Sequence, residues 1–531
     1  MLTIQTPPGC TTERAYTLGI LLGDWLGIPH TLTQTARAGV SIRLVGQPGE
    51  IRLPDSFFAQ FGQSGQYGQD SKSGQSTPAP ADWLSPASLP QPPLARWDSR
   101  ALAPDILLTD PLVPVLFGDR HDGDPDAKPI VAQQAEMAQT AVGPADEGRP
   151  AAGQGATSPT VAAAGRTIPP PSTTIPAPST TLRLPIDIFG AAFFMLSRYE
   201  EAVLPDRDHH DRFPATASLA YRAGFLDRPL IDEYLEILWT AMQRLWPGLQ
   251  RKPRQPRTLV TCDVDSPFAY TWTHKDAVRS LGGDLLKRRS LTLAWQNWRG
   301  YRRAQRGLPH DDPHLAGLAF IMDVNERAGR PVAFYFIPET TDPQLDNSVT
   351  LDDPRLRTLL REIHARGHEI GIHPGYHTYR HPEALTQSVV SLRRVLAEEA
   401  IDQSQLGGRQ HYLRWATPIT ARLWDDNSLS YDSTLSYAEC PGFRCGTCRE
   451  YTLYDLQQRR PLRLRERPLI IMERTVIAAH YLGLGNGDEA LNLMQKYRDI
   501  CHRFGGDFTL LWHNSHLNQE NEKRLYLSLV G

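Results

Sequence analysis

Two short stretches of the sequence contain carboxylates and imidazoles at spacings that suit metal-dependent hydrolysis. The first, TCDVDSP, places Asp263 and Asp265 two residues apart at the end of an apolar run. Residues i and i+2 of a strand point to the same side, and two neighbouring carboxylates need a cation between them or a proton on one. The pair is therefore predicted to supply one metal ligand and one general base. The alternative is a strand-ending Asx turn.

The second stretch, GHEIGIHPGYHTYRH, holds four of the 17 histidines. Its Pro-Gly dipeptide argues against a continuous helix, so His373 and His377 are predicted to lie across a turn after a strand. Together with one aspartate they would bind a divalent ion and leave positions open for water and substrate. These ligands suit zinc and also accept cobalt, nickel or iron. The alternative is a solvated loop, which is the interpretation adopted for His368 and His381.

Further candidate residues follow other apolar runs. LLWHNSH presents His513, whose imidazole titrates near neutral pH and suits a general acid. Glu473, a candidate substrate contact, closes PLIIMERT, and Arg414 lies near the end of QHYLRW. Trp512 is predicted either to wall an apolar pocket or to belong to the core.

The elements that would position these residues alternate between short apolar runs and helical stretches from residue 257 onward. Such alternation is typical of a mostly parallel α/β sheet or barrel, in which the carboxyl ends of the strands share one face. We predict an irregular seven-stranded (β/α) barrel over residues 255–531. Its strands are expected at RTLVTCDVD, PVAFYFIPE, HEIGIH, QHYLRW, YDSTLS, PLIIMERT and FTLLWHN, with helices at 352–367 and 381–400.

The first 250 residues differ in composition. Residues 62–95 and 119–181 are rich in Gly, Ser, Gln, Pro and Ala, and are predicted to be largely disordered insertions. ILLTDPLVPVLFGD between them is expected to contain a short strand. Helices are expected at 184–203 and 230–246 from their apolar spacing. Residues 1–250 are therefore predicted to form a small α/β domain interrupted by the two insertions.

Composition excludes several classes of protein. A formal net charge of −3 gives no global attraction to nucleic acid. No apolar run reaches the roughly 18 residues that cross a bilayer, and the start of the chain lacks a basic leader. Six scattered cysteines are too few for a disulfide framework and agree with a reducing compartment. A cytoplasmic protein is expected.

At these residues the sequence resembles the polysaccharide deacetylases of the NodB-homology type, carbohydrate esterase family 4, over about residues 257–531. Residues 193–201 (FFMLSRYEE), residues 212–229 and YDSTLSYAECPGFRCGTC resemble a subgroup with an uncharacterised N-terminal domain. The resemblance implies the following roles: Asp263 as base, His513 as acid, Arg414 as the arginine that orients the base, and Asp265, His373 and His377 as metal ligands.

The family's RxPYG pattern reads RWATP in this chain, so the identity of the substrate does not transfer. The resemblance implies removal of an N-acetyl group from a sugar, a glycan or a sugar-linked precursor by metal-activated water. Two alternatives stay open. One is a catalytically silent carbohydrate-binding or scaffold protein, and the other is an amidohydrolase acting on a non-sugar amide.

Two other signals are less specific. Cys440, Cys445 and Cys448 have the spacing that begins a plant-type [2Fe–2S] loop, but a structured loop with incidental thiols is the preferred interpretation. Arg444 and Arg449 in that loop are candidates for contacting an anionic substrate. Residues 285–307 hold seven cations, no acid, two Trp and one Tyr. This segment is predicted to be a solvated helix that packs its aromatic side on the barrel. The alternatives are peripheral contact with an anionic membrane surface and binding of a charged glycan or nucleotide-sugar.

Overall fold

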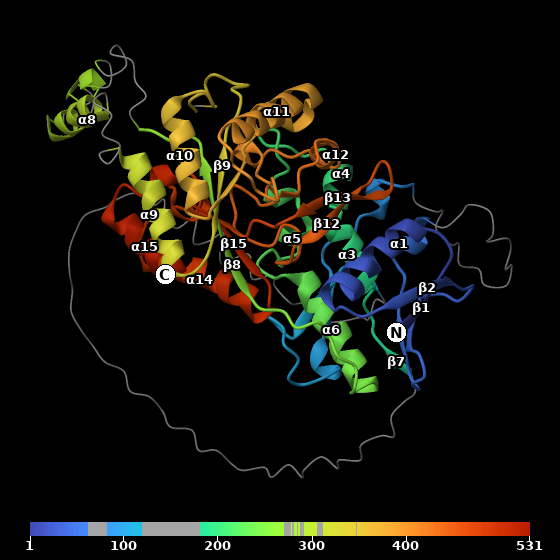
Figure 1. Cartoon of the computed structure of the whole chain (residues 1–531). Helices are drawn as coiled ribbons and strands as arrows, with labels where there is room; N and C mark the ends of the chain where they lie inside the picture. Colours follow the sequence, from blue (N-terminus) through green and yellow to red (C-terminus); the bar gives the residue numbers. More distant parts are fainter. Residues whose placement is uncertain are drawn as a thin grey trace, which may run out of the picture.

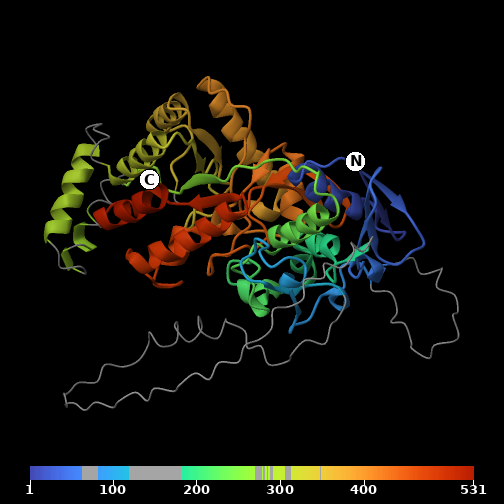
Figure 2. The ribbon, with the colours of Figure 1, turned by 90° about the horizontal axis from the view of Figure 1, so that it is seen from below.

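The structure, a computed structural model, describes residues 1–61, 82–118, 181–269, 278, 281–283, 285–286, 291–304, 312–346 and 348–531. The predicted disorder of 62–81 and 119–180 lies outside the described residues. Figures 1 and 2 show an N-terminal unit and a C-terminal unit packed side by side, with helix α8 (Leu291–Ala304) at the end farthest from the N-terminal unit.

The N-terminal unit is built on a mixed five-stranded sheet in the order β2-β1-β3-β4-β7, with a separate β5–β6 hairpin. Its strands are β1 (Leu2–Thr6), β2 (His30–Gln34), β3 (Val40–Leu44), β4 (Glu50–Leu53), β5 (Ala95–Asp98), β6 (Leu112–Val115) and β7 (Thr181–Arg183). Its helices are α1 (Thr11–Leu18), the π-helix η1 (Gly19–Trp25), α3 (Ile188–Leu196), α4 (Tyr199–Val203), α5 (Leu219–Arg222) and α6 (Leu230–Leu245). The predicted strand within residues 106–119 is β6.

The helix predicted over 184–203 is two helices. The carboxylate of Asp187 accepts the backbone N–H of Gly190 at 2.8 Å and begins α3. Arg198 then adopts the left-handed conformation, with φ of 54°, and separates α3 from α4. The helix predicted at 230–246 matches α6, whose apolar side is buried.

Residues 82–95 were predicted to be disordered and are instead packed on the core. The indole N–H of Trp83 donates to the carbonyl of Leu456 at 2.9 Å. The same ring lies 5.0 Å from Phe61 and 5.3 Å from Tyr199, measured between ring centroids. One large aromatic side chain therefore orders a stretch whose Pro- and Ser-rich composition suggested disorder.

The C-terminal unit contains a five-stranded parallel sheet in the order β10-β9-β8-β15-β14 and a three-stranded sheet, β11-β13-β12. Its strands are β8 (Arg257–Val264), β9 (Val332–Phe336), β10 (Glu369–Ile372), β11 (Tyr431–Asp432), β12 (Tyr451–Asp455), β13 (Arg460–Glu466), β14 (Ile471–Met472) and β15 (Asp507–Leu511). Parallel bridges from Gly408 to Ile372 and to Asp432 link the two sheets.

The prediction of a seven-stranded barrel is wrong, because no sheet closes on itself within the described residues. The predicted strand at 410–415 is absent. Its place is taken by a single bridging residue, Gly408, followed by the short helix η8 (His411–Leu413). The β12–β13 hairpin was not predicted. What remains is an α/β unit whose parallel strands end along one edge.

Helices cover the parallel strands, as expected for this connectivity. Two of them begin with an aspartate cap followed by proline: Asp312 caps α9, and Asp353 caps α10. The helices of this unit are α8, α9 (Pro313–Arg327), α10 (Pro354–Ala365), α11 (Pro382–Glu398), α12 (Ile419–Asp426), α13 (Glu473–Ile477), α14 (Asp488–Arg503) and α15 (Glu520–Val530). Among the described residues, no helix combines the length and the apolarity needed to cross a bilayer.

Candidate metal centre

The carboxyl ends of the parallel strands gather polar residues at one edge of the sheet. Asp263 lies near the end of β8, and Asp265 directly follows that strand. His373 directly follows β10, and Glu473 directly follows β14. Trp512 separates His513 from the end of β15. Because β8, β10, β14 and β15 run parallel in one sheet, these five side chains meet.

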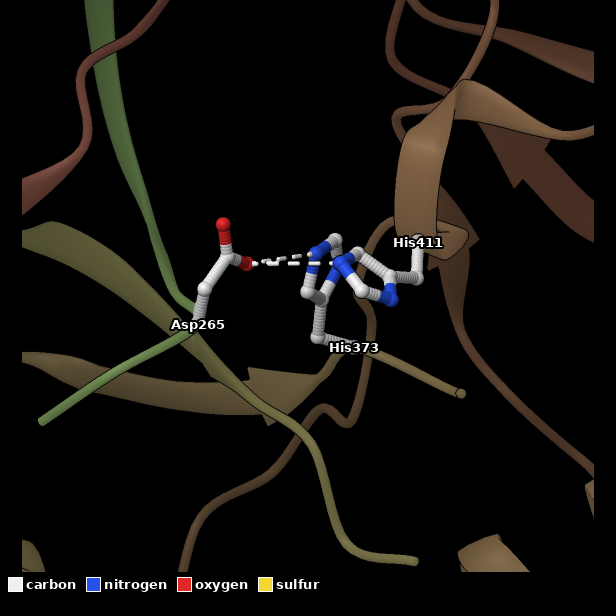
Figure 3. Close-up of side chains that lie close together, drawn as sticks. All are labelled: Asp265, His373 and His411. Carbon is white, nitrogen blue, oxygen red and sulfur yellow. Dashed lines mark ion pairs between the residues drawn. The ribbon is translucent and has the colours of Figure 1, made fainter. Parts of the chain in front are cut away.

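Asp265, His373 and His411 form a compact group of possible metal ligands (Figure 3). Oδ1 of Asp265 lies 3.3 Å from Nε2 of His373 and 3.8 Å from Nε2 of His411. That oxygen is buried and has no hydrogen-bond partner among the described residues. An unpaired buried carboxylate oxygen facing two imidazole nitrogens is the arrangement that a divalent cation would satisfy.

Both imidazoles are held through their other nitrogen. Nδ1 of His373 donates to the carbonyl of Arg409 at 2.6 Å, and Nδ1 of His411 is paired with a carboxylate oxygen of Asp346 at 2.7 Å. Asp346 also accepts the backbone N–H of Tyr376 at 2.9 Å. Such bonds fix the ring orientation and leave Nε2 free to bind a metal. The residues present therefore fit a metal site.

The electrostatics of the group favour positive charge. Burial opposes ionisation of Asp265, but the imidazole of His373, 3.3 Å from its Oδ1, and those of His411 and His513 lower its pKa well below the usual range. Burial also disfavours protonated His373, yet the carboxylates of Asp263 and Asp265 outweigh burial and raise its pKa. The carboxylates that would hold a proton on His373 would equally hold a metal cation.

The predicted ligand His377 is not part of this group. Its side chain is 49% exposed, and its Nε2 lies 3.3 Å from Oδ2 of Asp342 on the far side of the turn. His411, which the sequence analysis did not single out, stands beside Asp265 and His373 instead. The signal that pointed to His377, its spacing from His373, describes the turn but not the direction of the side chain.

Asp263 is held by Arg409 rather than by the predicted Arg414. Nη1 of Arg409 donates to Oδ1 of Asp263 at 2.7 Å and to Thr261 at 2.9 Å, and both charged side chains are buried. Oδ2 of Asp263 lies 3.7 Å from Nε2 of His373. Arg414 instead donates to the carbonyls of His210 and Tyr376. The structure thus places Asp263 beside the metal group, with one oxygen bound to arginine and the other facing the centre.

His513 lies on the opposite side of Asp265, with its Nε2 3.8 Å from Oδ2 of that residue. Its Nδ1 donates to Oε1 of Glu473 at 2.7 Å, and His516 donates to the same oxygen at 2.8 Å. Burial lowers the pKa of His513, but the Glu473 carboxylate and its hydrogen bond outweigh burial and raise that pKa to about 9. A protonated His513 at neutral pH is suited to donate a proton.

The remaining predicted substrate contacts, Trp512, Glu473 and Arg444, are buried. Trp512 is fully buried and packs edge-on against Tyr526, with ring centroids 5.1 Å apart. Glu473 is fully buried behind His513. Nε and Nη2 of Arg444 donate to the two carboxylate oxygens of Glu201 in the N-terminal unit, each at 2.8 Å. None of the three side chains presents itself to a substrate in this structure.

The cysteine loop is a contact between the two units. Arg449 pairs with Asp232 of α6 at 2.6 Å. Cys445 and Cys448 are buried, and burial raises the pKa of the Cys448 thiol well above its usual range. The groups of possible metal ligands found among the described residues contain no cysteine. These thiols belong to the core of the interface between the units.

Comparison with known proteins adds little about the chain as a whole. Residues 133–247 match DUF7033, a family of unknown function. These residues include the FFMLSRYEE segment. No protein with a curated description matches the sequence.

Several solved structures are similar at low identity. A putative polysaccharide deacetylase from Mycobacterium smegmatis is 16% identical with a TM-score of 0.33, covering 52% of this chain and 84% of its own. Puue allantoinase is 15% identical with a TM-score of 0.31, covering 54% and 85%. A probable polysaccharide deacetylase from Pseudomonas aeruginosa PAO1 is 15% identical with a TM-score of 0.32, covering 54% and 85%.

Proposed function

We propose that this protein is a metal-dependent hydrolase that removes the acetyl group from an N-acetylated sugar or glycan intermediate. One arrangement carries the proposal: the buried, unpaired Oδ1 of Asp265 faces the Nε2 atoms of His373 and His411. An arginine-held aspartate lies on one side of this group and a glutamate-held histidine on the other.

Asp265, His373 and His411 would hold the metal, with zinc the first candidate and cobalt, nickel or iron acceptable to the same ligands. When bound, such an ion polarises the acyl oxygen and lowers the pKa of a water molecule. His377 is replaced by His411 in this assignment, because His411, unlike His377, brings an imidazole nitrogen to Oδ1 of Asp265.

Asp263 is the proposed base. Arg409 occupies its Oδ1, so the lone pairs of Oδ2 remain for a proton from the attacking water. Arg409 itself holds the carboxylate in one orientation, and its own position is fixed by further bonds to Thr261 and Ser433. Arg409 thus has the orienting role that the family resemblance suggested for Arg414.

His513 is the proposed acid. As the carbon–nitrogen bond of the amide breaks, Nε2 of His513 gives its proton to the departing amine. The acyl carbon keeps the oxygen of the water and leaves as acetate. Glu473 binds Nδ1 of His513 and stabilises its protonated form before transfer. His516 contributes a second bond to the same carboxylate oxygen.

The choice of an N-acetylated sugar rests on the motif resemblance, and the six free cysteines support the proposed cytosolic setting. The competing substrates are non-sugar amides. A panel of N-acetylated sugars, sugar-linked precursors and simple amides, assayed for acetate or amine release, separates the two classes.

Metal content tests the site without any guess at the substrate. We expect about one divalent ion per chain in the wild-type protein. His411→Ala should weaken zinc affinity about 100-fold or more in a chelator competition, whereas the matched variant His377→Ala should leave it unchanged. Loss of metal in His377→Ala with retention in His411→Ala would overturn the ligand assignment. No metal in any of these proteins after zinc and cobalt soaking would overturn the function.

Asp263→Asn distinguishes an enzyme from a silent binding protein. An enzyme should lose turnover and keep its metal, because Asp263 is not among the proposed ligands. Equal acetate release by the wild type and Asp263→Asn would exclude this base.

A further inference from the structure

Helix α8 exposes large apolar side chains along one face. Leu291 is 78% exposed, Trp295 60% and Trp298 38%. These residues are spaced i, i+4 and i+7, so they share one side of the helix. Elsewhere in the described chain, tryptophans such as Trp25, Trp246, Trp415, Trp424 and Trp512 are buried. Exposed aromatic residues in a row indicate a surface that meets a partner.

The packed residues of α8 flank the apolar row, since Ala294 is i+3 from Leu291 and Tyr301 is i+3 from Trp298. Ala294 and Tyr301 are 5% and 1% exposed, and Gly300 is buried. Tyr301 is therefore the buried aromatic side chain of this segment. Trp295 and Trp298 point to solvent. Figures 1 and 2 show that α8 projects from the end of the molecule, where a flat surface could reach it.

Cations border the apolar row. The guanidinium of Arg299 lies 5.1 Å from the centre of the Trp295 ring, and that of Arg302 lies 5.7 Å from the centre of the Trp298 ring. Both arginines are exposed. The sequence of α8, LTLAWQNWRGYRRA, contains no acidic residue. The exposed face therefore combines indole rings with positive charge, and no carboxylate on the helix neutralises it.

We infer that α8 is an in-plane anchor for an anionic lipid surface. Leu291, Trp295 and Trp298 would enter the boundary between headgroups and acyl chains, where tryptophan is favoured. Arg299 and Arg302 would pair with lipid phosphates. A second copy of the chain fits less well, since two α8 faces in contact would bring four arginines together without a carboxylate from either helix. This inference is independent of the proposed hydrolysis, so either can fail alone.

Vesicle sedimentation of the full-length protein tests the anchor. We expect binding to vesicles that contain phosphatidylglycerol, little binding to pure phosphatidylcholine, and loss of binding as salt rises. Arg299→Gln/Arg302→Gln should weaken binding about 25-fold, because each basic residue near such a surface contributes about a factor of five. Trp295→Ala/Trp298→Ala should weaken it at least about 10-fold.

Matched controls lie on other helices and strands. Val390→Ala removes a 54% exposed apolar residue of α11, and Arg463→Gln removes a 76% exposed arginine of β13. Neither should change vesicle binding. Undiminished binding by the Trp double variant would overturn the inference, as would equal binding to neutral and anionic vesicles. Failure of the wild type to bind anionic vesicles would overturn it as well. In that case, a wild-type dimer that Trp298→Ala makes monomeric in analytical ultracentrifugation would identify a second copy of the chain as the partner.

Discussion

At the scale of single residues, the chemistry of the site depends on which side chain holds each reactive group. Asp263 and Asp265 could be predicted from the sequence, because two carboxylates at i and i+2 after an apolar strand face the same side and need a cation or a shared proton. Their partners could not. Arg409 and His411 follow the glycine pair of LGGRQH, where neither apolar periodicity nor a histidine repeat marks them.

Arg409→Lys tests the assignment of the arginine. Lysine keeps the charge but cannot reproduce the bonds of Arg409 to Asp263, Thr261 and Ser433. We expect kcat on a substrate found with the panel of N-acetylated compounds to fall about 100-fold, while metal content stays constant. Both quantities are measured on the same preparations, by steady-state kinetics and elemental analysis.

The matched variant is Arg414→Lys. Arg414 is also buried, but it binds backbone carbonyls rather than Asp263. Its replacement should lower the unfolding temperature as Arg409→Lys does, with kcat changed only a few-fold. A loss of kcat in Arg414→Lys that exceeds the loss in Arg409→Lys would return to Arg414 the orienting role that the motif resemblance implied.

At the scale of elements, Gly408 joins the two sheets of the C-terminal unit and begins the segment that carries Arg409 and His411. A Cβ at this position would lie 1.9 Å from the carbonyl oxygen of Ile372 in β10. Only glycine lets the two backbones approach closely enough for the bridge. The predicted strand at 410–415 was misplaced because its aromatic and β-favouring residues lie after the actual point of pairing.

Gly408→Ala should therefore damage the fold and the site together. We expect a loss of about 1–3 kcal/mol in the free energy of unfolding, measured by urea denaturation, and weaker zinc binding because His411 moves away from Asp265. Gly248→Ala is the control, since a Cβ there meets nothing within 4 Å. Unchanged zinc affinity in Gly408→Ala would show that the bridge does not position the ligand.

The elements that could be predicted are those with continuous apolar character. β8, β9, β10 and β15 are buried along most of their length and read as apolar runs in the sequence. The β12–β13 hairpin could not be predicted in the same way. β13 reads RPLRLRE and is half exposed, so its alternating arginines resemble a polar loop.

At the scale of the whole molecule, one hydrophobic core runs through both units, from Leu2 to Val530. The loop at 440–449, which the sequence analysis considered as a contact for an anionic substrate, is buried between the units. Its arginines pair with Glu201 and Asp232, each of which is at most 2% exposed. The position of the candidate metal centre relative to the N-terminal unit therefore depends in part on buried ion pairs that no local pattern in the sequence could reveal.

The Glu201–Arg444 pair makes stability depend on pH in a definite direction. Burial raises the pKa of Glu201, but Arg444 and Arg198 outweigh burial and lower it to about 2. An unfolded glutamate has a pKa of about 4.3. The pair therefore stabilises the fold fully above about pH 4.5, and this contribution is lost as pH falls toward 2.

Glu201→Gln removes that contribution and leaves Arg444 and Arg198 buried without their shared carboxylate. We expect the free energy of unfolding at pH 7 to fall by about 3 kcal/mol. The difference from the wild type should shrink between about pH 4.5 and pH 2.5, because the wild type loses the same contribution by protonation. Urea denaturation across this range measures both effects. The control is Glu398→Gln, which removes a carboxylate from a surface ion pair and should change neither the free energy of unfolding at pH 7 nor its dependence on pH. A constant difference between wild type and Glu201→Gln at every pH would show that Glu201 has the same pKa in the folded and the unfolded protein, so that Arg444 and Arg198 do not lower it.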